Sequence, residues 1–100
     1  MKKEDLVAMP INPNVMRFNV ALNEGCGSEI LRVQVERQKS GANLYGNQTA
    51  VAVYVNEKLF QLFETRYNKK MNTVEGFQDC FTEWVQDTWK ENAIRIERIL

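Results

Sequence analysis

Hydrophobic residues recur at helical spacing in one long stretch, residues 72–91. At about 100° of rotation per residue, one face of such a helix gathers the apolar side chains. They are Val74, Phe77, Phe81, Trp84, Val85 and Thr88, with Cys80 and Trp89 at the margins. At the start of the stretch, Asn72 and Glu75 match a capping box in which Asn72 is the N-cap. The pattern therefore predicts one long amphipathic helix whose apolar face must be covered by the rest of the chain.

Four stretches are predicted to form strands, and the first two alternate between hydrophobic and polar residues, as strands do that are buried on one side only. They are residues 14–22 and 30–38 in a first hairpin, and residues 49–55 and 58–66 in a second. The inward residues of the first hairpin are Met16, Phe18, Val20, Leu22, Leu31, Val33 and Val35. The second hairpin is predicted to turn at Asn56 and Glu57. The polar residues 39–48, which include two glycines, are expected to form a mobile loop between the hairpins.

The last residues allow two interpretations. Residues 93–97 alternate like a short final strand, whereas Ile96, Ile99 and Leu100 would continue the apolar face of the helix if it ran on. The content of β-branched residues favours the strand.

The second hairpin has an unusual distribution of apolar residues. If two residues form its turn, Val53 faces Phe60 and Val51 faces Leu62, and this side can receive the helix. The other side then carries Tyr54, Leu59, Ala52, Gln61, Ala50, Phe63 and Tyr67. Such a side is too apolar to be meant for water alone, so we expect another part of the chain or a partner to cover it.

These elements predict an α+β fold: a mainly antiparallel four- or five-stranded sheet with one long amphipathic helix packed on one face. One hundred residues with 44% hydrophobic content fit a single domain. We expect residues 1–13, which contain Pro10 and Pro13, to be a flexible leader, and residues 14–100 to be the domain. With one helix available, only one face of the sheet can be covered from within the chain.

The composition excludes several kinds of chemistry. The chain has no histidine and only two cysteines, Cys26 and Cys80, so it lacks the usual general base and the usual zinc ligands. We expect no catalytic residue, no cofactor and no metal site, and therefore no enzyme. No apolar stretch has the length of a membrane span or of a signal peptide. This predicts a cytoplasmic protein without a membrane partner, in which both cysteines are reduced.

Charge is distributed unevenly, although the net charge is zero. Acidic residues occupy every fourth position of the predicted helix: Glu75, Asp79, Glu83, Asp87 and Glu91. One alternative hypothesis is that Asp79, Glu83 and Asp87 dock on a basic groove of another protein, as an inhibitor or adaptor would.

A second alternative is a sheet that binds single-stranded nucleic acid. Lysine and arginine residues would hold phosphates while aromatic residues stack on bases. The candidates are Arg66, Tyr67, Lys69 and Lys70, with Lys58, Arg37 and Lys39 nearby and Tyr54 and Phe63 for stacking. The zero net charge and the lack of an RNP-like string disfavour this alternative.

No motif in the sequence assigns a function. The hypothesis that fits the pattern best is a small non-enzymatic protein-protein interaction module. It would form a homodimer, or bind a protein partner, through the apolar second face of its sheet. The residues expected to make this contact are Tyr54, Leu59, Phe63 and Tyr67.

Overall fold

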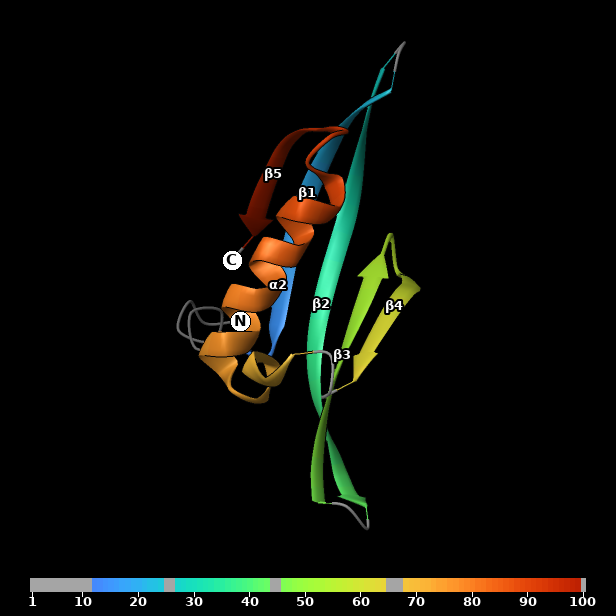
Figure 1. Ribbon diagram of the computed structural model, residues 1–100. Coiled ribbons are helices and arrows are strands. Elements are labelled where there is room, and N and C mark those ends of the chain that lie inside the picture. Colours follow the sequence, from blue (N-terminus) through green and yellow to red (C-terminus); the bar gives the residue numbers. More distant parts are fainter. Residues whose placement is uncertain (1–11, 25–26, 44–45, 65–67, 100) are drawn as a thin grey trace, which may run out of the picture.

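The computed structural model describes residues 12–24, 27–43, 46–64 and 68–99, which form one antiparallel sheet and one long helix. The elements are β1 (Val15–Glu24), β2 (Gly27–Asn43), β3 (Gly46–Val55), β4 (Lys58–Glu64), the 3-10 helix η2 (Lys69–Asn72), α2 (Val74–Trp89) and β5 (Ala93–Ile99). The strand order is β4-β3-β2-β1-β5 (Figure 1). The predicted α+β fold is confirmed with five strands in the described residues, and residues 93–99 form a strand, as the content of β-branched residues favoured. No helix in this part of the chain is long and apolar enough to cross a membrane.

One connection runs from one edge of the sheet to the other. Strands β1 to β4 follow one another as neighbours, and η2 and α2 then lead from β4 at one edge to β5 at the other edge, beside β1. Both edge pairs contain a register shift, between Val53 and Tyr54 in β3–β4 and between Ala21 and Leu22 in β1–β5. Such bulges make an edge strand a poorer template for further strand pairing.

The prediction of a mobile loop at residues 39–48 is wrong. Strand β2 continues to Asn43 and β3 begins at Gly46, with Lys39 opposite Thr49 and Ser40 opposite Gln48. In Figure 1 this part of the β2–β3 ribbon extends beyond the end of α2. No helix that the structure describes covers this part of the ribbon, so it needs no hydrophobic alternation, while its backbone groups still pair. Residues 44 and 45 lie outside the described part.

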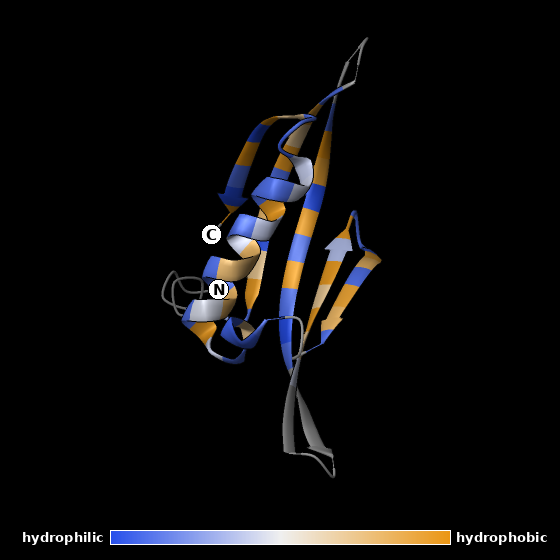
Figure 2. Ribbon diagram, viewed as in Figure 1, coloured by the Kyte–Doolittle hydropathy of each residue, from blue (hydrophilic) through white to orange (hydrophobic). Residues whose placement is uncertain are grey.

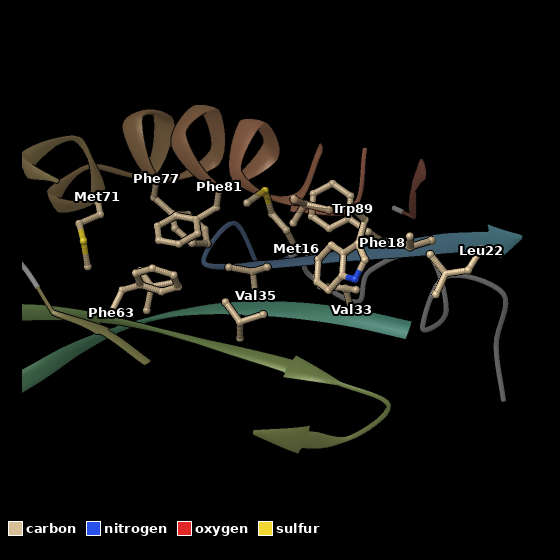
Figure 3. Close-up of a cluster of buried hydrophobic side chains, with 14 residues drawn as sticks. Met16, Phe18, Leu22, Val33, Val35, Phe63, Met71, Phe77, Phe81 and Trp89 are labelled. Carbon is tan, nitrogen blue, oxygen red and sulfur yellow. The ribbon is translucent and has the colours of Figure 1, made fainter. Parts of the chain in front are cut away.

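The core lies between α2 and one face of the sheet (Figure 3). The inward residues predicted on β1 are buried, as are Val33 and Val35, whereas Leu31 is half-buried. On α2 the buried residues are Phe77, Phe81, Val85 and Trp89. Figure 2 shows the same alternation of hydrophobic and polar residues along β1 and β2.

The buried stripe of α2 differs from the predicted one at its end. Thr88 is exposed and donates a hydrogen bond to the Trp84 carbonyl oxygen over 2.7 Å, while Trp89 is buried. Residues four apart are offset by about 40° around a helix, so a stripe with this spacing winds toward Trp89 along α2. Packing along such a ridge is common where a helix crosses its neighbours at an angle.

The predicted capping box is also wrong, by one residue. Asn72 ends η2, and Thr73 is the N-cap of α2, with its Oγ1 accepting from the Gly76 backbone N–H over 3.1 Å. A Cβ at Gly76 would lie 2.1 Å from the Lys70 carbonyl oxygen, so η2 and α2 approach closely enough to require glycine there. The short helix η2 ends at Asn72, the residue that the sequence pattern assigned to the N-cap, so the cap of α2 moves to Thr73.

Arg37 fixes the entry to the helix. Its side chain lies on the helix side of β2, where Nε donates to the Met71 carbonyl oxygen over 2.8 Å. Nη1 donates to Asn14 Oδ1 over 2.9 Å, and Nη2 donates to the Asn72 carbonyl oxygen. One guanidinium thus ties the last two residues of η2 to the sheet.

We expect Arg37→Met to lower the free energy of unfolding by about 1.5–3 kcal/mol, because hydrogen bonds from a charged donor are lost. Arg98→Met is the matched control, since the Arg98 side chain is exposed on the helix side of β5. The control should change stability by no more than about 0.5 kcal/mol. Urea unfolding of both variants measures the difference, and equal losses would show that Arg37 does not hold the helix entry.

The predicted turn at Asn56 and Glu57 is confirmed, and both residues have positive φ, 50° and 72°. This is the left-handed backbone of the hairpin turn that favours Asn-Gly. We expect Glu57→Gly to raise the free energy of unfolding by about 0.5–1 kcal/mol, because glycine adopts this conformation without a Cβ clash. Glu57→Ala removes the same carboxylate but keeps a Cβ, so thermal unfolding should show no gain for this control.

Candidate functional site

The sheet has a second face, on the side opposite α2 and η2, which we term the open face. The strand registers place these residues on it: Val15, Arg17, Asn19, Ala21, Ile30, Arg32, Gln34, Glu36, Ala50, Ala52, Tyr54, Leu59, Leu62, Glu64, Arg95, Glu97 and Ile99. Leu59, Leu62 and Ile99 are 60%, 56% and 42% exposed. No helix or strand that the structure describes lies over this face.

A bulge in β4 changes which residues reach the open face. Near the turn, Tyr54 pairs with Leu59 as predicted, but Val53 then pairs with Gln61 and Val51 with Phe63. Phe60 is the extra residue, so the predicted pairs of Val53 with Phe60 and of Val51 with Leu62 are wrong. A bulge of one residue moves each later side chain to the opposite face.

Phe63 is therefore not on the second face, where the sequence analysis expected a partner contact. It is 5% exposed and lies edge-on against Phe81 and Trp84, with ring centroids 5.1 and 5.4 Å away. Figure 3 shows it on the same side of the sheet as α2. Gln61, opposite the buried Val53, leaves the predicted set as well. Leu62 takes their place on the open face, opposite Ala52.

The other predicted site residues fall on two separate surfaces. Tyr54 and Leu59 are neighbours on the open face, and Tyr67 lies outside the described residues. Asp79, Glu83 and Asp87 are exposed on α2, which covers the opposite face of the sheet. No single partner surface unites the two groups.

The three helix carboxylates border a hollow of about 250 Å³ beside η2. The other lining residues are Asn68, Lys70, Cys80 and Trp84. Burial raises the pKa of the Cys80 thiol, against the opposing influence of Lys70 and of Asn68, whose Nδ2 donates to Sγ over 3.4 Å. The thiol is therefore neutral at pH 7, which makes it a poor nucleophile and metal ligand. Among the described residues, no group of three or more His, Cys, Asp or Glu side chains is arranged to hold a metal ion.

The basic and aromatic residues proposed for nucleic-acid binding are not gathered around Tyr54. Arg37 is bound to η2, Lys69 and Lys70 belong to η2 itself, and Phe63 is in the core. Tyr54 lies on the other side of the sheet. Arg66 and Tyr67 lie outside the described residues.

The centre of the open face is a shallow hollow of about 460 Å³. Its lining includes Arg17, Asn19, Arg32, Gln34, Glu36 and Tyr54, with Ile99 at the border. Arg17 Nε donates to Gln34 Oε1 over 3.1 Å, and Gln34 Nε2 donates to Glu36 Oε1 over 2.6 Å. This chain of hydrogen bonds holds three side chains of β1 and β2 in place. The sequence analysis missed them, because outward polar residues on a strand are also what a solvated face requires.

Substitutions at the two neighbouring positions 62 and 63 test the bulge directly. We expect Phe63→Ala to lower the free energy of unfolding by about 3–5 kcal/mol, because it empties a packed aromatic site. Leu62→Ala, on the open face, should change the stability of the isolated chain by about 0.5 kcal/mol or less. Urea unfolding would contradict the observed register if the two costs were reversed.

The hollow on the open face thus exceeds the hollow beside η2 in volume, and the open face combines exposed aliphatic side chains with an ordered polar centre. Its members come from all five strands, so only the folded sheet brings them together. No family model, no curated protein and no solved structure matches the chain.

Proposed function

We propose that the chain is a small, non-catalytic protein-interaction module that docks onto another protein through the open face of its sheet. The observation that carries this proposal is the exposure of Leu59, Leu62 and Ile99 on that face. A sheet normally buries at least one face, and several large apolar side chains exposed on the other are typical of an interaction surface.

The size of the open face suits a protein partner. Five strands, each taking up about 4.8 Å of the width of the sheet, cover roughly 24 Å, and the outward residues of β2 from Ile30 to Gln38 extend over about 27 Å. The resulting area is on the order of 600 Å² per copy, close to the roughly 800 Å² that each partner contributes to a standard interface.

The charges of the open face favour a protein over a polyanion. Among the residues that the structure describes, three arginines and four glutamates lie on it or at its border: Arg17, Arg32, Arg95, Glu36, Glu57, Glu64 and Glu97. Nucleic acid binds where lysine and arginine dominate a surface. A mixed pattern instead suits a protein surface with its own pattern of both signs.

Site-specific photo-cross-linking in cells tests the proposal. A photoreactive benzoylphenylalanine at position 62 should give a protein adduct that is identified by mass spectrometry. The same group at position 75, which is exposed on α2, is the control and should give none. Adding Leu59→Lys should reduce the adduct from position 62 at least about tenfold, since a charge would be buried in the contact.

Equal adducts from positions 62 and 75 would show that the open face has no special role. The absence of any adduct from position 62 would contradict the proposal outright.

A further inference from the structure

We infer that the protein docked on the open face is a second copy of this chain, with the two β2 strands antiparallel and related by a twofold axis at Gln34. This inference rests on the proposed function and names its partner. It follows from the order of side chains on β2, the central strand of the sheet.

The outward side chains of β2 carry opposite charges on the two sides of Gln34. Arg32 lies two residues before it and Glu36 two residues after it, on the same face. They are separated by about 13 Å along the strand, too far to pair within one chain. Arg32 instead makes an exposed pair with Glu57 at 3.4 Å, and Glu36 accepts from Gln34.

A twofold axis across the strands at Gln34 brings the opposite charges together. It lays Arg32 of each copy over Glu36 of the other, which gives two equivalent ion pairs, as an isologous interface requires. Facing sheets lie about 10 Å apart, a gap that an arginine and a glutamate side chain can bridge together. Gln34 lies over Gln34, and an amide can both donate to and accept from another amide.

The same axis passes along one row of paired residues across the whole sheet. The row is Leu59, Tyr54, Gln34, Arg17 and Ile99, from β4 to β5. Each residue meets its own counterpart, so leucine covers leucine at one edge, isoleucine covers isoleucine at the other, and the tyrosines lie between. The two Arg17 side chains are the one like-charge contact that the described register gives, and each is held to Gln34 of its own chain.

The expected strength of the dimer is moderate. Two faces of on the order of 600 Å² bury roughly 1,200 Å² in total, the lower end of the range for specific interfaces. Because ion pairs lie at its centre, the dimer should also weaken as salt is added.

Charge reversal at positions 32 and 36 tests the inference. We would measure the mass of the purified full chain by light scattering over roughly a hundredfold range of concentration. Wild type should dimerise, whereas Arg32→Glu and Glu36→Arg should each raise the dissociation constant at least about tenfold, because like charges then face each other.

Mixing the two variants should restore the dimer, because an acidic copy then faces a basic copy at both positions. The double variant R32E/E36R should also dimerise, with the charges exchanged. Arg98→Glu and Glu75→Arg are the matched controls, since Arg98 lies on the helix side of β5 and Glu75 on α2, and both should dimerise like wild type.

A wild-type chain that stays monomeric at every concentration would overturn the dimer. So would a dimer that tolerates both reversals, because its contact would lie elsewhere. If the monomer is accompanied by an adduct of position 62 with a different protein, the dimer fails but the docking function stands. If there is neither dimer nor adduct, both fail.

Discussion

Burial of the apolar stripe of α2 is the interaction on which the rest of the structure depends. Phe77, Phe81, Val85 and Trp89 are all buried against the sheet, and each large side chain contributes roughly 1.5–3 kcal/mol when removed from water. A helix is about 10 Å wide with its side chains and lies on one side of the sheet. The only long helix that the structure describes therefore covers one face of the sheet. The other face has no described helix to cover it, and this is the open face.

The bulge at Phe60 decides how the second hairpin shares its aromatic residues between the two faces. It turns Phe63 into the core against Phe81, and it leaves Phe60 on the helix side, with its ring centroid 5.8 Å from that of Trp89. The aromatic cluster is thus completed by an edge strand. The same bulge leaves Leu62 exposed on the open face, where it lies beside the exposed Leu59 at the edge of the sheet.

Local patterns were sufficient for the parts of the fold that depend on local rules. The alternation in β1 and the turn at Asn56 and Glu57 are set by neighbouring residues, and both were predicted. The bulge could not be predicted, because Phe60 and Phe63 are both apolar and either register buries one of them. The strand pairing beyond residue 38 was missed because backbone hydrogen bonds carry no hydrophobic signal. Of the site, Tyr54 and Leu59 were predicted, whereas Arg32, Gln34 and Glu36 resembled an ordinary solvated strand.

The order of charges on β2 argues for a partner that is specific in register. A surface of one sign attracts any partner of the opposite sign, but opposite charges on either side of Gln34 favour only a strand that presents the same order in reverse. The simplest such strand is β2 itself, turned by a twofold axis. A slip by two residues along the strand would place Gln34 over a charge and lose both ion pairs, so the polar centre sets the register while the aliphatic ends contribute buried area. In such an arrangement the polar residues of the open face determine the specificity for the partner, and burial of the exposed leucines and isoleucine contributes to the affinity.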